Sequence, residues 1–268
     1  MANPKTFDVR KQRGFNTVAM LCFILLYAPI IILVVYSFNA GRSIAIWEGF
    51  SLQWYVAAWE NQKVQDATLR SLILALSASA VATSAAVLAA LATTRTSAFK
   101  GSTFVFAMIN QPLMVPEIVT AVALLIFFAM IKVATGYTGL WYLIVAHSAF
   151  CIPFAYMPIR ARLQGMDLNL EQAGADLYAT PWRVFWTITF PQLWPGVLAG
   201  AMLAFVISLD DVVITEFVKS AGQDTLPTYM LGQLRRVITP EVNAISTVLL
   251  AISIAMVVAF FVLSRVKK

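Results

Sequence analysis

Long apolar runs alternate with short polar segments along most of this chain, and this alternation predicts its secondary structure. An α-helix needs about 20 mostly apolar residues to cross the hydrocarbon core of a bilayer. Six runs reach that length, at about residues 15–38, 69–93, 103–131, 139–159, 186–209 and 243–264. The first run has too long an apolar core for a signal peptide, and no small-residue cleavage site follows it, so we expect an anchor. The pattern predicts an all-α integral membrane protein with six transmembrane helices.

The second and third runs carry features that a helix facing only lipid does not need. The second run is rich in Ala, Ser and Thr, which let helices approach closely, so we expect it in the interior of the bundle. The third run is interrupted by Pro112 and Pro116, with Asn110 and Glu117 beside them. A broken, polar helix is tolerated in a membrane only where protein or a water-filled path covers it. The third run is therefore predicted to border such a path.

Composition agrees with a membrane protein and removes several other classes. Hydrophobic residues make up 60% of the chain and charged residues 12%, whereas soluble proteins are about half apolar and a quarter charged. The net charge of +6 does not indicate nucleic acid as a partner, because the basic residues stand at the edges of apolar runs rather than in one patch. With one His and two Cys, we expect no metal site. The expected surroundings are a lipid bilayer.

The distribution of Lys and Arg predicts the orientation, because short cytoplasmic segments of membrane proteins are rich in both. With a cytoplasmic N-terminus, the segments on the inner side hold 12 of the 19 Lys and Arg residues. These segments are 1–14, 94–102, 160–185 and 265–268. We therefore expect both termini in the cytoplasm, with a cytoplasmic N-terminal tail at 1–14 and a six-span transmembrane domain at 15–268.

The stretch "LQGMDLNLEQAGADLYATPWRVFWTITFPQLWPG" (163–196) contains signals for two short cytoplasmic helices. Asn169 is placed to cap the first, with Gln172 as its capping-box partner, so a helix is expected over about 170–177. The Thr-Pro pair at 180–181 is typical of the start of a second helix. Two capped helices are more than a connection between spans needs. The loop is therefore predicted to dock onto a cytoplasmic partner.

This loop, at about 163–191, resembles the EAA motif of ABC importer permeases, which reads Glu-Ala-Ala, three residues, Gly, nine residues and then Ile-x-Leu-Pro. The corresponding residues here are Gln172, Ala173, Gly174, Tyr178, Ile188, Phe190 and Pro191. Glu171, one residue early, is a candidate for the acid of the motif. The glycine of the family suits a left-handed turn after the first helix. Tyr178 therefore either costs about 1 kcal/mol at that position or changes the turn.

The resemblance extends over nearly the whole chain to the permease subunits of spermidine/putrescine ABC importers. It rests on "LYAPIIILVVYSFN" (26–39), "QPLMVPEIVTAVALL" (111–125), "AFVISLDDVVITEFV" (204–218) and "TPEVNAISTVLL" (239–250), in that order. It implies the type I ABC importer permease fold in a bacterial inner (cytoplasmic) membrane. It also implies three kinds of partner: a second, homologous permease subunit, two ATPase subunits and a periplasmic substrate-binding protein.

In the family that the chain resembles, ATP is hydrolysed by separate ATPase subunits. Nothing in this chain resembles a Gly-rich loop that cradles phosphates. We therefore expect a transport subunit without enzymatic activity or a cofactor of its own, with ATP and Mg²⁺ held by the partner ATPases. The first helix of the loop would convert closure of the ATPases into a tilt of the spans. The candidate coupling residues are Glu171, Gln172, Ala173, Gly174, Leu177 and Tyr178.

Two adjacent carboxylates, Asp210 and Asp211, follow the fifth run. The 16 residues from Trp194 to Leu209 make about 24 Å of helix, which predicts that both acids lie near the outer membrane edge. They are either a solvated helix end or a cation-attracting mouth for a substrate with several ammonium groups. Neighbouring residues of a helix point about 100° apart, so at most one of the two faces the path directly. The sequence does not choose between them.

Glu117 follows Pro116 within the third run, where a carboxylate is costly in hydrocarbon. It is either a substrate-contacting or gating residue, or a structural carboxylate in a buried pair or at the start of a half-helix, whose N-terminus favours an anion. His147 is more typical of a hydrogen-bonded packing residue, but it remains a candidate together with Asn110. The candidate substrate path comprises Glu117, Asp210, Asp211, His147 and Asn110.

An ABC importer permease for polyamines is the function that these features favour. The first alternative keeps the permease role for another amine, an amino-acid-derived or an opine-like solute. A more remote alternative is an ion-coupled secondary transporter that uses the acids as its coupling site, but such proteins usually show an internal repeat, and the docking loop would then have no role. An intramembrane enzyme is disfavoured because the sequence shows no nucleophile–base set.

Overall fold

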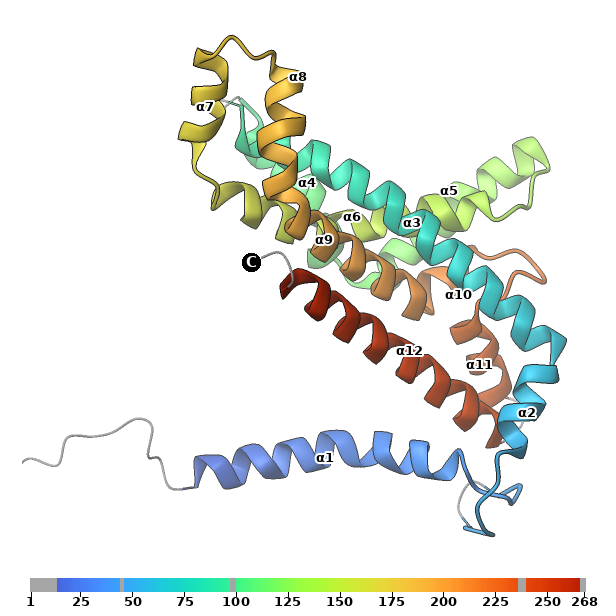
Figure 1. The fold of residues 1–268 in the computed structure, drawn as a ribbon. Helices are drawn as coiled ribbons and strands as arrows, with labels where there is room; N and C mark the ends of the chain where they lie inside the picture. The colour runs from blue at the N-terminus through green and yellow to red at the C-terminus, as the bar shows by residue number, and fades with distance from the viewer. Residues whose placement is uncertain (1–13, 44–45, 97–99, 236–239, 266–268) are drawn as a thin grey trace, which may run out of the picture. The chain divides into compact units, whose positions relative to one another are not determined.

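The computed structural model describes residues 14–43, 46–96, 100–235 and 240–265. Every regular element within these ranges is a helix (Figure 1), which confirms the predicted all-α class. The one extended pairing among the described residues is an isolated antiparallel bridge between Asn39 and Phe50. The predicted N-terminal tail lies outside the described residues except for Gly14, so its structure stays a prediction.

Six helices in the described part of the chain are long and apolar enough to cross a membrane, as the hydrophobic pattern predicts. They are α1 (Phe15–Tyr36), α3 (Gln62–Thr94), α5 (Glu117–Thr135), α6 (Trp141–Gln164), the helix Pro181–Asp210 and α12 (Pro240–Arg265). The chain is therefore a multi-pass membrane protein.

The predicted third span at 103–131 is broken into two helices, as its prolines indicate. It consists of α4 (Ser102–Met114) and α5, and of these two only α5 is long enough to cross the membrane. The break falls at Val115, whose backbone is extended, and at Pro116, whose φ is −54°. Proline removes a backbone donor and disfavours helical geometry in the residue before it. Glu117 therefore begins α5, which agrees with the half-helix start that the sequence offered as one of its two readings.

The core of the residues from 61 to 232 is formed by α3, α6 and α9 (Phe190–Asp210), which pack against one another. The Ala-rich run of α3 lies inside this core, with Ala75, Ala78, Ala82 and Ala86 fully buried, which confirms its predicted interior position. On α9, a Cβ atom on Gly200 would lie 2.7 Å from the backbone oxygen of Ala155 in α6. These small residues let the three helices approach closely.

The second helix of the predicted docking loop and the fifth span are continuous with each other. Thr180 caps α8 (Pro181–Val184), which passes through a π-helical segment (Phe185–Thr189) directly into α9. The π segment contributes one wider turn without ending the helix. The fifth transmembrane element therefore reaches from the predicted docking loop to Asp210 without interruption (Figure 1).

After α9 the chain folds back against the helix bundle. A short helix, α10 (Val213–Val218), packs against α5 and α6. Its Ile214 and Val218 belong to the apolar core. The segment then continues to α11 (Leu226–Leu234). The residues that follow Asp211 are thus a folded part of the bundle, so Asp210 and Asp211 do not stand at a solvated helix end.

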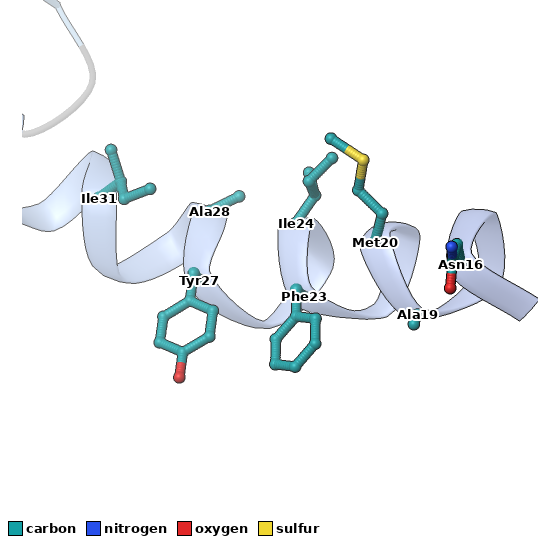
Figure 2. A pocket seen from close by; sticks show the side chains of 8 residues that line it. All are labelled: Asn16, Ala19, Met20, Phe23, Ile24, Tyr27, Ala28 and Ile31. Atoms are coloured by element: carbon teal, nitrogen blue, oxygen red, sulfur yellow. The ribbon is translucent and has the colours of Figure 1, made fainter. Parts of the chain in front are cut away.

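A second compact unit contains α1, α2 (Gln53–Glu60) and the first part of α12. Its loop is organised around Asn39, whose fully buried amide side chain accepts from the N–H of Glu48 at 2.8 Å and donates to the carbonyl of Ile46 at 2.7 Å. A hollow of about 570 Å³ lies along one face of α1, beside Phe23 and Ile31. Figure 2 shows the eight side chains that line it. Every residue lining this hollow belongs to one helix, so it is an open apolar surface and not an enclosed site.

Candidate functional site

A cavity of about 430 Å³ brings together the three acids that the sequence singled out. It is lined by Glu117, Phe150, Phe154, Val206, Ile207, Asp210, Asp211, Val212 and Val213. These residues come from the start of α5, the middle of α6 and the junction of α9 with α10. Glu117 and Asp211 lie close enough for their carboxyl groups to interact. None of the described residues that line the cavity is basic, so it is a carboxylate-rich chamber.

The predicted position of Asp210 and Asp211 at the outer membrane edge is wrong. Phe150 and Phe154, which line the same cavity, are the tenth and fourteenth residues of the 24-residue α6. The acids thus lie beside the middle of a transmembrane helix. Helix length alone could not predict this position, because the chain after Asp211 folds back as α10 against α5 and α6.

Asp211 is buried and its carboxylate holds the start of α10. Its Oδ1 accepts from the N–H of Ile214 at 3.2 Å, and its Oδ2 accepts from the N–H and the hydroxyl of Thr215 at 2.9 and 2.8 Å. The Nε2 atom of His147 lies 3.3 Å from Oδ2. The Asp211 side chain is only 2% exposed. Its oxygens are therefore engaged by the protein itself.

Asp210 has different surroundings from its neighbour. It is the last residue of α9, it is exposed, and it lines the cavity. The backbone of Asp211 is already extended, so the two side chains leave the chain in different directions. Of the two aspartates that the sequence could not separate, the geometry favours Asp210 as the one that meets a substrate.

His147 lies behind the acid cavity and not on its wall. The buried imidazole lies 2.9 Å from the Ser208 hydroxyl through Nδ1 and 3.0 Å from the Thr215 hydroxyl through Nε2. Because Thr215 donates its hydroxyl hydrogen to Asp211, its oxygen is left to accept from Nε2, and Nδ1 then accepts from Ser208. His147 thus orients the groups around Asp211, and the geometry favours its reading as a hydrogen-bonded packing residue.

Asn110 is separate from the other candidates for the substrate path. Its side chain is buried in α4 and donates to the carbonyl of Phe106, one turn earlier in the same helix, at 2.8 Å. It is not among the residues that line the acid cavity. The structure therefore groups Glu117, Asp210 and Asp211, and leaves Asn110 apart from them.

Outside the membrane-spanning helices, Lys219 is held between two acids. Its Nζ lies 2.6 Å from Glu216 and 2.7 Å from Asp224. Burial alone would lower the pKa of Lys219, but the hydrogen bonds and charges of Asp224 and Glu216 raise this pKa above its usual value. The ion pairs are therefore present throughout the physiological pH range, and Glu216 is committed to this cluster.

The first helix of the predicted docking loop, α7 (Leu168–Asp176), starts earlier than predicted. Its N-cap is Asp167, whose carboxylate accepts from the N–H of Asn169 at 3.0 Å, so the predicted Asn169 cap is wrong. An Asp and an Asn two residues apart are equally good caps by type, and the sequence signal did not separate them. The predicted cap at Thr180 is confirmed, since its hydroxyl oxygen accepts from the N–H of Arg183.

Tyr178 keeps the left-handed turn for which the family uses glycine. Its φ is 59°, and it is the one non-glycine residue with positive φ in the described part of the chain. The N–H of Tyr178 donates to the carbonyl of Ala175 at 2.9 Å and that of Ala179 to Gly174 at 3.1 Å, which is the Schellman pattern. Tyr178 therefore preserves the turn at the cost of an unfavourable backbone conformation.

The candidate coupling residues divide into an outward and an inward group. Gln172, Ala173, Leu177 and Tyr178 are exposed, with Leu177 at 82% and Tyr178 at 97%. Gly174 is buried, and a Cβ atom there would lie 2.9 Å from Cδ1 of Ile188. Glu171 also points inward, toward Arg95 and Thr189. The outward group presents an apolar and aromatic tip, whereas the inward group fixes α7 to the bundle.

Several residues that the structure places at these sites were not among the sequence candidates. In the sequence, Phe150 and Phe154 look like ordinary apolar residues of a span, and Arg95 served only to predict the orientation. Thr189 carried no signal at all. A period of four between the two phenylalanines put them on one face of a helix, which was the only available clue to their shared role.

Comparison with known proteins identifies the family. A family model described as "Binding-protein-dependent transport system inner membrane component" matches residues 82–268. The putrescine transport system permease protein PotI of Escherichia coli K12 is 35% identical over 255 residues, which cover 94% of this chain and 91% of that protein. The spermidine/putrescine transport system permease protein PotC of the same strain is 36% identical over 258 residues, with 96% of each chain covered.

Solved structures support the same conclusion for the fold. A chain of a bacterial ABC transporter involved in the import of alginate superposes with a TM-score of 0.74 at 15% identity, and 92% of each chain is covered. A chain of the MetNI methionine ABC transporter gives a TM-score of 0.62 at 17% identity, covering 75% of this chain and 94% of that one. The fold is that of ABC importer permeases. With the family match over most of its length, this chain belongs to the binding-protein-dependent transport system inner membrane components.

Proposed function

We propose that this chain is a permease subunit of an ATP-driven importer for polyamines such as putrescine and spermidine. A second permease subunit completes the substrate path, two ATPase subunits drive it, and a periplasmic binding protein delivers the substrate. The subunit lies in the bacterial inner membrane with both termini in the cytoplasm. The relatives named above, at 35% and 36% identity over nearly the whole chain, support this proposal for the transport class.

The acid cavity is the observation that carries the substrate class. Glu117 and Asp210 offer carboxyl groups to a chamber whose described lining holds no Lys or Arg. Carboxylates inside a transmembrane bundle are costly unless a cation or another partner compensates them. A polyamine supplies ammonium groups joined by methylene chains, which suits a chamber that is part carboxylate and part apolar.

The aromatic wall of the cavity fits the same cargo. Phe150 and Phe154 lie one turn apart on α6, with ring centroids 5.5 Å from each other. An ammonium group over an aromatic face is attracted by the ring, by about 0.5–2 kcal/mol depending on desolvation. The cavity thus combines two kinds of group that attract cations, and neither would favour an anionic solute.

In this proposal, the chain's own residues bind and guide the substrate while ATP is bound elsewhere. His147 and Thr215 hold Asp211 in place, which leaves Glu117 and Asp210 to exchange ammonium groups with the passing substrate. ATP and Mg²⁺ are held by the partner ATPases, whose movement reaches this chain through α7. The continuous helix from Pro181 to Asp210 connects the cytoplasmic loop with the acid cavity.

The deciding experiment is ATPase stimulation in proteoliposomes that contain both permease subunits, the ATPases and the cognate binding protein. Putrescine, spermidine and a panel of amino acids and opines are each added outside. We expect stimulation by the polyamines alone. Stimulation by another solute instead would keep the permease role and overturn the polyamine assignment.

A further inference from the structure

Glu171 belongs to the cytoplasmic helix α7, yet its carboxylate points into the protein. Its Oε2 atom lies 3.0 Å from Nε of Arg95, and its Oε1 atom accepts from the hydroxyl of Thr189 at 3.0 Å. The side chain of Glu171 is only 19% exposed and that of Arg95 only 16%. A carboxylate held in this way is not presented to a docking ATPase, unlike the exposed residues at the end of α7.

Arg95 connects the ends of three helices. It is the C-cap residue of α3. Its Nη1 donates to the carbonyl of Leu163, near the end of α6, at 3.1 Å, while its Nε donates to Glu171 of α7. The planar guanidinium can serve both partners at once because its donors point in fixed, different directions. Arg95 therefore fixes α7 relative to two helices of the core.

Thr189 extends this connection to the fifth span. It is the last residue of the π segment, it is only 4% exposed, and its hydroxyl meets the same Glu171 carboxylate. The π segment is a local departure from α-helical geometry, of the kind that often marks functional sites in helices. From Thr189 the helix runs without a break to Asp210 in the acid cavity.

We propose that Arg95, Glu171 and Thr189 form a coupling clamp that transmits movement of α7 to α9 and so to the acid cavity. The three are positioning residues, and contact with the ATPases falls to the exposed tip of α7, formed by Leu177 and Tyr178. This inference rests on the proposed function, because it takes the ATPases as the source of movement. The Arg95–Glu171 ion pair is largely buried. Removing either partner therefore leaves the other charge uncompensated, which keeps the two helices joined through this contact.

The test compares variants of the complete transporter with and without polyamine. Arg95→Gln and Glu171→Gln should each lower polyamine-stimulated ATPase activity at least about tenfold, while the ATPases still copurify with the permeases. Thr189→Val, which removes only the hydroxyl, should lower it about threefold. The double variant Arg95→Gln/Glu171→Gln should keep at least as much stimulated ATPase activity as the less active single variant, because the effects of mutations within one network are not additive. Arg95→Lys should recover part of the activity.

The matched control is Thr187→Val. Thr187 lies in the same π segment but is exposed, and its hydroxyl donates to the carbonyl of Arg183 in its own helix. It should leave stimulation unchanged. Wild-type stimulation in Arg95→Gln, or equal losses in the two threonine variants, would overturn the clamp. Loss of ATPase copurification in Glu171→Gln alone would show instead that Glu171 contacts the ATPases directly. If the charge variants do not insert, the two threonine variants decide the question.

A second readout separates failure of the clamp from failure of the polyamine assignment. Hydrogen exchange of residues 200–212 is followed in the complete transporter when a non-hydrolysable ATP analogue binds, with no polyamine present. We expect a change in exchange in the wild-type complex that Glu171→Gln and Thr189→Val lose and Thr187→Val keeps. If this exchange pattern is observed but polyamines do not stimulate the ATPases, the substrate assignment is overturned and the clamp is retained. An unaltered response in the clamp variants would sink the clamp, whichever solute is transported.

Discussion

At the residue scale, the two adjacent aspartates at the end of α9 show how surroundings separate groups that the sequence makes equivalent. The Asp211 carboxylate accepts hydrogen bonds from Thr215 in the first turn of α10 and lies beside His147, whereas Asp210 remains exposed to the cavity. The difference depends on where α9 ends and α10 begins. Two adjacent aspartates in a sequence do not show where one helix ends and the next begins. The sequence therefore predicted both acids as candidates, but not which of them faces the cavity.

The first prediction concerns the two acids that face the cavity. Glu117→Gln and Asp210→Asn should each lower polyamine uptake at subsaturating concentration by about tenfold, because each removes a charge-assisted contact of about 1.5–3 kcal/mol. The measurement is the rate of labelled spermidine uptake over a range of concentrations. Glu216→Gln is the control, since Glu216 pairs with Lys219 outside the cavity lining. Equal losses in all three variants would refute a specific role for the cavity.

The second prediction concerns the residues behind the cavity. His147→Leu should destabilise the protein by about 1–3 kcal/mol, because the buried Ser208 hydroxyl loses its imidazole partner and the Asp211 carboxylate loses a polar neighbour. The readout is the melting temperature of the purified chain in detergent. Ser148→Ala is the matched control, since the buried Ser148 hydroxyl bonds only the carbonyl of Ile144 within α6 among the described residues. Combining His147→Leu with Thr215→Val should cost less than the sum of the single changes.

At the element scale, local signals predicted well the features that depend on a few neighbouring residues. The cap at Thr180-Pro181, the interior position of the Ala-rich helix and the break at Pro116 all follow from short-range chemistry. The continuity of α8 with α9 was missed. Pro191 and Pro195 lie inside the continuous helix, where neighbouring helices and local π geometry compensate for the missing backbone donors. The buried helix α10 was missed too, because burial of six residues is decided by long-range packing.

The third prediction tests the turn that ends α7. Tyr178→Gly should stabilise the purified chain by about 1 kcal/mol, because glycine adopts the left-handed conformation without the penalty of a Cβ atom. Ala175→Gly, inside α7, should have the opposite sign and cost about 1 kcal/mol. Melting temperatures of the isolated chain report both effects without a contribution from the ATPases. A loss of stability in Tyr178→Gly would mean that its ring, and not its backbone, determines the effect.

At the scale of the whole molecule, the sequence supplied the components of the site but not their arrangement. Glu117 and Asp210 are 93 residues apart in the chain, and hydrophobic periodicity carries no information about which helices adjoin. The hydrophobic pattern and the family resemblance predicted the fold, and the structure then brought the acids together in one cavity. The inward direction of the Glu171 side chain is a similar case, since its partner Arg95 is 76 residues away in the sequence.

The last prediction tests the orientation that both proposals require. The Arg95–Glu171 pair puts the connection after α3 at the same end of the bundle as α7, so both must face the cytoplasm if ATPases dock there. In a Cys22→Ser background, a cysteine at Lys100 should react with a membrane-impermeant maleimide only in inside-out vesicles. A cysteine at Ala221, in the connection between α10 and α11, should react only in right-side-out vesicles, and both positions are exposed. The distribution of Lys and Arg predicts this result. The reverse pattern would place α7 outside the cell, away from any ATP, and both the coupling clamp and the ATP-driven import would then be untenable.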